Sequence, residues 1–190
     1  VTYNYVENTW ATGSLARTTY ADNHTYDLPY ATEFEATSTP TFPTINGVTN
    51  TVGATRYWSH ETGTNEIYAD GTSVAITSFV VSGDYDLDRH QGLNGSGEDI
   101  MRVSRFIPDF KNLSGNAKVT LRFRNYPGES ESTDDNYPLI TGPFTVNTTT
   151  TFVSTRVRGR QVSLKIENDG KDESWRYGTL RLDVSAGGRR

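Results

Sequence analysis

Apolar and polar residues alternate along several short stretches of the chain, most clearly in its second half. In residues 118–124 (KVTLRFR), valine, leucine and phenylalanine alternate with lysine, threonine and arginine, and residues 161–167 (QVSLKIE) and 179–184 (TLRLDV) repeat the pattern. Successive side chains of a strand point to opposite faces, so each stretch predicts a strand with one buried face. We expect the apolar residues of the three stretches to form one core: Val119, Leu121, Phe123, Val162, Leu164, Ile166, Leu180, Leu182 and Val184.

The rest of the chain also favours strands over helices. Threonine, valine, tyrosine and isoleucine are frequent and turn residues recur throughout, which is typical of an all-β chain. Asn168-Asp169-Gly170 predicts a turn. We expect the strands on either side of it to be antiparallel neighbours, with Trp175 and Tyr177 on their connection. The predicted strands are 1–6, 9–17, 55–61, 74–81, 101–107, 118–125, 150–156, 161–167 and 179–184.

Three stretches between these strands are predicted to be connections. Residues 36–51 include two prolines, residues 91–97 read QGLNGSG, and residues 128–135 read GESESTDD and lack residues that could form a core. Near Ile76, short irregular strands give way to strong alternation, which predicts a domain boundary there. The predicted domains are residues 1–76 and residues 77–190.

The composition allows a thin core that is rich in aromatic side chains. Hydrophobic residues make up 34% of the chain and aromatic residues 12%, and aromatic side chains bury a large area each. The absence of cysteine excludes disulfides and thiolate metal sites. No apolar stretch has the length of a membrane span, and no signal-peptide pattern opens the sequence.

Acidic and basic residues are unevenly distributed. Residues 1–101 contain three arginines against thirteen acidic residues, whereas residues 102–190 contain fifteen basic against ten acidic residues. The two halves are therefore expected to have different surfaces and different neighbours. Met101 is the only methionine, so we expect either a cleaved N-terminus or the C-terminal part of a longer polypeptide, and GGRR, which resembles a natural tail, favours the second.

Combinations of residues that bind metals are not prominent. Asp84, Asp86 and Asp88 alternate like the oxygen ligands of a calcium loop, but Arg89 and Gly95 stand where such a loop needs glycine and glutamate. We interpret the three aspartates as solvated strand or turn residues. We expect no metal and no cofactor.

Catalytic patterns are equally weak. His60 and Glu61 are interpreted as a hydrogen-bonded structural pair, because no second histidine follows at helical spacing. The sequence contains no G-x-S-x-G motif, and carboxylate pairs such as Glu33 and Glu35 are too common in loops to indicate a glycosidase. We therefore expect the chain not to be an enzyme.

Three arginines surround a glycine in the stretch RVRGR. Arg156, Arg158 and Arg160 occupy alternate positions, so one strand face carries all three unless a bulge at Gly159 turns one away. Arginine pairs with carboxylates through two hydrogen bonds, and the acidic residues 129–135 and the acidic first half of the chain are available partners. The arginines are therefore predicted to hold one domain or subunit against another. Plain solvated charge is the alternative.

Five segments follow one another along nearly the whole chain: YNYVENTWATGSLARTTY (3–20), YWSHETGTN (57–65), VVSGDYDLD (80–88), RFIPDF (105–110) and RGRQVSLKIEN…WRYGTLRLDV…GGRR (158–190). In this order they resemble the C-terminal part of the tail nozzle (tail tubular) proteins of short-tailed bacteriophages. No single motif carries the resemblance.

The resemblance implies a fold, a place and a set of partners. It implies a β-propeller-like portion followed by an antiparallel β-sandwich, in a virion protein of the phage tail. It implies six copies in a ring below the portal and adaptor, near the tail fibre or spike proteins, around the channel through which double-stranded DNA leaves.

A channel that DNA crosses quickly should not hold phosphates, because each lysine or arginine contact adds affinity. The acidic first half is therefore predicted to line the channel, and the alternative is that its acidic residues simply keep the outer surface soluble. The channel-facing candidates are Asp84, Asp86, Asp88, Glu98 and Asp99.

Two other classes of function remain open. One is a carbohydrate-binding β-sandwich of a virion receptor-binding or depolymerase protein, which planar aromatic side chains exposed in one groove would favour. Trp10, Trp58 and Trp175 are available, although tryptophans more often fill a core. The other is an enzyme that degrades glycans, which would need paired carboxylates in a cleft.

Overall fold

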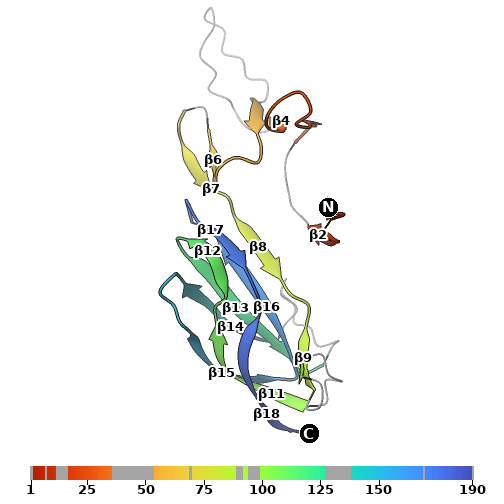
Figure 1. Cartoon of the computed structure of the whole chain (residues 1–190), viewed down its shortest axis with the longest axis vertical. Helices are drawn as coiled ribbons and strands as arrows, with labels where there is room; N and C mark the ends of the chain where they lie inside the picture. Colours follow the sequence, from red (N-terminus) through yellow and green to blue (C-terminus); the bar gives the residue numbers. More distant parts are fainter. Residues whose placement is uncertain are drawn as a thin grey trace, which may run out of the picture. The chain divides into compact units, whose positions relative to one another are not determined.

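The computed structural model describes residues 2–6, 8–11, 17–35, 54–68, 70–88, 92–93, 99–126, 138–168 and 170–189. These residues form antiparallel strands in several sheets, none of them closed, and include no helix, so the predicted all-β class is confirmed at this level (Figure 1). It follows that they contain no helix able to cross a membrane. The chain divides into two compact units, Val1–Gly63 and Thr64–Arg190. The domain boundary near Ile76 stays a prediction.

The first unit contains two small sheets. One pairs two strands, and the other has three strands in the order β3-β4-β5. Of the strand predicted over 9–17, residues 9–11 form β2, residues 12–16 lie outside the described part of the chain, and Arg17 lies just before β3. The strands are β1 (Thr2–Asn4), β2 (Thr9–Ala11), β3 (Thr19–Ala21), β4 (Tyr30–Glu35) and β5 (Ala54–Ser59).

The largest sheet of the second unit has six strands. Its order is β10-β9-β16-β13-β14, and β8 pairs with β16 on the same side as β9 (Figure 1). The 74–81 prediction covers two strands, because the pairing of β7 ends at Ala75 and β8 begins at Ser78. The strands are β8 (Ser78–Val81), β9 (Tyr85–Asp88), β10 (Gly92–Leu93), β13 (Ala117–Arg124), β14 (Leu139–Val146) and β16 (Gln161–Asn168).

Three smaller sheets complete the second unit. Three strands pair in the order β15-β11-β18, β12 pairs with β17, and β6 pairs with β7. The strands are β6 (Asn65–Ile67), β7 (Ser73–Ala75), β11 (Asp99–Ile107), β12 (Phe110–Ser114), β15 (Val153–Gly159), β17 (Ser174–Tyr177) and β18 (Arg181–Arg189).

The predicted core is confirmed, and it draws on both large sheets. The six predicted residues of β13 and β16 are buried, together with Met101, Val103 and Phe106 of β11. Leu180, Leu182 and Val184 are partly buried and pack against the same cluster. The six-stranded and three-stranded sheets therefore share one hydrophobic core.

The predicted pairing of strands 161–167 and 179–184 is wrong. β16 pairs with β13, β8 and β9, whereas β18 pairs with β11 in the other sheet. The connection between them contains β17, which was predicted to be loop and pairs with β12. Both strands bury apolar residues in the same core, β16 from the six-stranded sheet and β18 from the three-stranded sheet. Between them, the chain passes from one sheet to the other through β17.

The central strands are buried on both faces, although alternation predicted one buried face. Thr120 and Arg122 of β13 point away from the core, yet only 6% of each is exposed. The Arg122 side chain donates a hydrogen bond from Nη2 to the hydroxyl of Ser163 on β16, at 3.1 Å. Polar residues at alternate positions therefore form a second, buried polar layer on these two strands.

Candidate interaction surface

The outer face of the three-stranded sheet carries four arginines. Arg102 of β11 lies directly opposite Arg158 of β15, and the inward-facing Val103 lies opposite Val157. Because side chains directly opposite each other share a face, Arg102 and Arg158 both point outward. Arg156 and Arg105 share this outer face, and all four arginines are exposed. We call Arg102, Arg105, Arg156 and Arg158 the arginine face.

Only one of these arginines has a described carboxylate partner. Arg105 donates from Nε to Oδ2 of Asp183 on β18 at 2.6 Å, and its guanidinium lies 5.2 Å from the ring centre of Phe152. Among the residues that the structure describes, Arg102, Arg156 and Arg158 make no ion pair. The arginine face therefore has an excess of positive charge at its β15 edge.

The third predicted arginine lies apart from the other two. β15 ends at Gly159, and Arg160 forms the link to β16, which belongs to the other sheet. The backbone N–H of Arg160 donates to the carbonyl of Arg124 at 3.1 Å. A Cβ at Gly159 would come within 3.1 Å of the Phe123 side chain, so glycine lets the chain pass closely over the core as it changes sheets. Arg156 and Arg158 therefore share a face without Arg160.

The predicted channel-facing acids lie in different environments. Asp84 forms an ion pair with Arg124 and is mostly buried, so it is not a solvated residue. Asp86 is partly buried on β9, opposite Gln161. Asp99 is 4% exposed at the start of β11. The Asp88 side chain and Glu98 lie outside the described part of the chain.

The side chains of Asp84 and Asp99 are therefore mostly shielded from solvent. Whether the remaining acids line a channel stays a prediction.

Glu33 is the centre of a polar cluster in the first unit. Its Oε2 accepts hydrogen bonds from Arg17 Nη1 and Trp58 Nε1, each at 2.7 Å, and its Oε1 lies 3.4 Å from Arg56 Nη1. Arg17 also donates from Nε to His60 Nε2 at 3.3 Å. The predicted pair of His60 with Glu61 is therefore wrong, because His60 accepts its hydrogen bond from Arg17.

This cluster fixes β4 to β5 and to the segment before β3. Glu33 is 9% exposed, and donors surround its carboxylate. These hydrogen bonds and ion pairs connect three segments of the chain, which indicates a structural role for the cluster.

Tyrosines cluster on the other face of the same small sheet. Tyr30 and Tyr57 stack with ring centres 5.5 Å apart, and Tyr26 meets Tyr30 edge to face at 5.2 Å. Tyr26 and Tyr57 are exposed. We call Tyr26, Tyr30 and Tyr57 the tyrosine cluster; its exposed rings offer flat apolar surface with hydroxyl groups at the edge.

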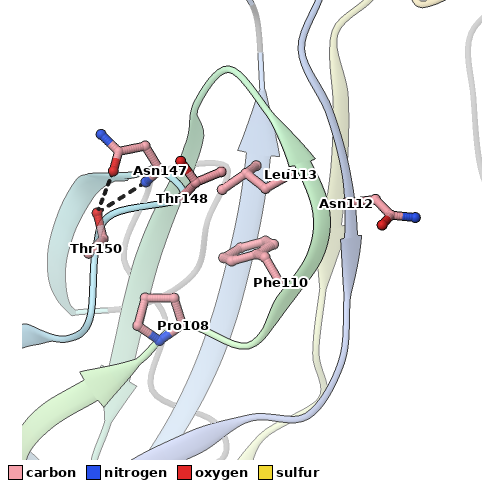
Figure 2. Close-up of a pocket in the computed structure, with 7 residues that line it drawn as sticks. All are labelled: Pro108, Phe110, Asn112, Leu113, Asn147, Thr148 and Thr150. Carbon is pink, nitrogen blue, oxygen red and sulfur yellow. Dashed lines mark hydrogen bonds between the residues drawn. The ribbon is translucent and has the colours of Figure 1, made fainter.

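A cavity of about 330 Å³ lies between β12 and the turn that follows β14 (Figure 2). Phe110, Leu113 and Pro108 form its apolar side, and Asn112 also belongs to its lining. Asn147 Oδ1 accepts hydrogen bonds within the turn, including one from the Thr150 hydroxyl at 3.2 Å. The turn itself therefore occupies the side-chain oxygen of Asn147.

A larger cavity of about 520 Å³ lies beside β8 and β16, lined by apolar residues that include Val80, Leu164 and Leu180. Tyr177 also lines it, and its buried hydroxyl has no hydrogen-bond partner among the described residues. Burial raises the pKa of the Tyr177 hydroxyl well above its usual value, and electrostatic interaction with the Tyr85 side chain and with the Asp109 carboxylate raises it further. This cavity contains no carboxylate pair for catalysis.

The edge strand β8 exposes a run of apolar residues. It pairs with β16 and with no other described strand, and Phe79, Val80 and Val81 are all exposed, Phe79 by 62%. Uncovered apolar edge strands promote association, so natural proteins usually cover or charge them. This edge is therefore suited to burial in an assembly.

Sequence reasoning identified Arg156 and Arg158 but missed Arg102 and Arg105. Their signal was present, because Arg102 alternates with Met101 and Val103 as an outward residue of a strand does. What alternation cannot give is the register that sets Arg102 opposite Arg158. Strand pairing between residues so far apart in sequence is a property of the fold.

No group of three or more residues able to hold a metal ion occurs in the described part of the chain. Comparison of the sequence with models of protein families gives no match, and comparison with curated proteins gives none either.

Proposed function

We propose that the chain is a structural subunit of a short bacteriophage tail, in the ring-shaped nozzle through which DNA is ejected. The observation that carries the proposal is the apolar edge strand β8, whose exposed Phe79, Val80 and Val81 call for a covering neighbour. The resemblance of five ordered segments to the tail nozzle family supplies the kind of assembly. In this proposal the neighbour is another copy of the same chain in a six-membered ring.

The proposal also assigns an architecture to each region. The second unit is the terminal β-sandwich, which is supported by the core that its two large sheets share. The first unit belongs to the end of a propeller-like portion, which is supported by its short antiparallel sheets. The ring adjoins the adaptor, the portal and the tail fibre or spike proteins of the virion.

The test uses the whole protein as the virion contains it. Light scattering and electron microscopy should find a six-fold ring, and Phe79→Ser should weaken the ring by removing an apolar contact at the subunit boundary. Tyr126→Ser is a matched control, because Tyr126 is 64% exposed but follows the end of β13 rather than lying on β8. A protein that remains monomeric, in particles without a six-fold ring on the tail, would refute the proposal.

A second candidate, carbohydrate binding by a virion receptor-binding protein, is supported by the tyrosine cluster. Aromatic rings bind sugars through their flat faces, and the exposed rings of Tyr26 and Tyr57 are accessible. Glycan-array binding that Tyr57→Ala abolishes, with Tyr126→Ala as the unchanged control, would favour this function. Absence of glycan binding by the intact chain would leave the structural role alone.

A further inference from the structure

We propose that the free edge of β15 binds an extended acidic segment of a partner protein. The segment adds to the sheet as a new strand and places carboxylates beside Arg156 and Arg158. The proposal concerns the arginine face and is independent of the role in a phage tail.

The first observation is a concentration of like charge. Arg102 and Arg158 lie directly opposite each other on neighbouring strands. Side chains in such positions have Cβ atoms about 5 Å apart, and like charges there destabilise the sheet. Arg156 adds a third charge on the same face, about 7 Å along β15 from Arg158. Since these three arginines form no ion pair among the described residues, an anionic partner would relieve their repulsion.

The second observation is an unused strand edge. β15 pairs with β11 along one side and with no other described strand along the other. It has seven residues and no proline, so its outer edge can accept a strand of similar length. Backbone N–H and C=O groups along such an edge supply affinity for an extended peptide, and alternate side chains supply specificity.

The two observations point to the same ligand. An extended peptide with glutamate at every second position repeats its carboxylates with the same spacing as Arg156 and Arg158. Each carboxylate can meet the planar fork of a guanidinium through charge-assisted hydrogen bonds. A DNA duplex offers phosphates but no backbone that can extend a sheet. A second copy of β15 would place arginine near arginine, so the same charges disfavour self-pairing.

The experiment measures binding of labelled seven-residue peptides to the full chain by fluorescence anisotropy. One peptide alternates glutamate with threonine, and a second has the same composition with its glutamates adjacent. The alternating peptide should bind more tightly. The double variant Arg156→Ala, Arg158→Ala should lose about tenfold in affinity, which corresponds to two exposed ion pairs.

A control variant and a charge exchange test the specificity. Arg176→Ala removes an exposed arginine from β17, in a different sheet, and should leave the affinity unchanged. The double variant Arg156→Glu, Arg158→Glu should bind a peptide in which lysine replaces glutamate. Circular dichroism establishes that each variant keeps its β-sheet content.

Several results would overturn the proposal. Equal binding of the two acidic peptides would mean that charge acts without strand addition. Binding of a short DNA duplex that depends on Arg156 and Arg158, without peptide binding, would identify a nucleic-acid surface instead. Self-association of the chain that the double alanine variant abolishes would identify a second copy as the occupant, and absence of all binding would leave the arginines as solvated charge.

Discussion

Truncation of two core leucines should destabilise the second unit by different amounts. Leu121 of β13 and Leu164 of β16 are cross-strand partners in the core, and both are almost completely buried. They differ in one respect: Leu164 also lines the cavity of about 520 Å³, whereas Leu121 does not. The side chain of Leu164 therefore has fewer packing partners to lose on one side.

The magnitude follows from the void that each truncation leaves. Leucine-to-alanine substitutions in cores cost about 2.7–5.0 kcal/mol, rising by about 24 cal/mol for each Å³ of residual cavity. An additional void of about 50 Å³ at the better-packed position then costs about 1 kcal/mol more. We expect Leu164→Ala to lower the free energy of unfolding by about 3 kcal/mol and Leu121→Ala by about 4 kcal/mol.

Urea unfolding followed by circular dichroism measures both values. Ile140→Ala is the control, because Ile140 is an exposed residue of the edge strand β14, and it should cost less than about 1 kcal/mol. An unchanged stability for Leu164→Ala would mean that the inward face of β16 is assigned wrongly. A larger loss for Leu164→Ala than for Leu121→Ala would refute the argument from the cavity.

Three further predictions concern the buried hydroxyl of Tyr177, the ion pairs of Glu33 and the close contact between Gly159 and Phe123. Tyr177→Phe should not lower stability at neutral pH, because it removes a buried hydroxyl without a described partner. Since the folded pKa of Tyr177 is raised, its hydroxyl ionises first in the unfolded chain, so the wild type should lose stability above about pH 10 more steeply than Tyr177→Phe. Glu33→Gln should destabilise the first unit by about 1–3 kcal/mol, because it removes the carboxylate that forms ion pairs with Arg17 and Arg56. Thermal unfolding measures the loss, with Glu61→Gln at an exposed position as the control. Equal losses for the two variants would contradict the structural role of Glu33. Gly159→Ala should lower the free energy of unfolding in urea by about 1–3 kcal/mol, because the new Cβ would press against the Phe123 side chain. Gly83→Ala is the control and should cost less than about 0.5 kcal/mol, because the space around its Cβ is open. Similar losses for the two variants would exclude the contact with Phe123.

The alternation of apolar and polar residues predicted the core strands, because this pattern depends only on residues that are close together in the sequence. β13 and β16 show the period of two plainly, and their inward residues are those that the pattern assigned to the core. β14 escaped prediction because it contains Gly142 and Pro143, which break most strands. Proline is tolerated there because β14 lies at the edge of its sheet and pairs with β13 alone. Edge position depends on the assembled sheet and is not encoded in the strand's own residues.

Only part of the arginine face could be predicted from the sequence, because the spacing of residues along one strand is local whereas the pairing of strands is not. That Arg156 and Arg158 share one strand face follows from their spacing, and the structure agrees with it. That Arg102 joins them depends on the pairing of β11 with β15, in which Arg102 lies opposite Arg158, 56 residues later in the sequence. The ion pair of Asp84 with Arg124 is another long-range contact, and it turns a residue that looked solvated into a buried one.

The arginine face limits how a DNA channel could be arranged around this chain. Each arginine that contacts a phosphate releases counterions and adds salt-dependent affinity, so three uncompensated arginines on a channel wall would slow the passage of DNA. The acids cannot offset this charge from a distance, because screening confines their effect to about 8 Å at physiological salt. If the proposed ring is right, the outer face of β11 and β15 must therefore point away from the channel, toward a neighbouring protein. A map of the assembled ring in which Arg102, Arg156 and Arg158 line the channel would contradict this arrangement. With these arginines in the channel, the rate of DNA ejection should rise with salt concentration, because salt weakens their contacts with phosphates.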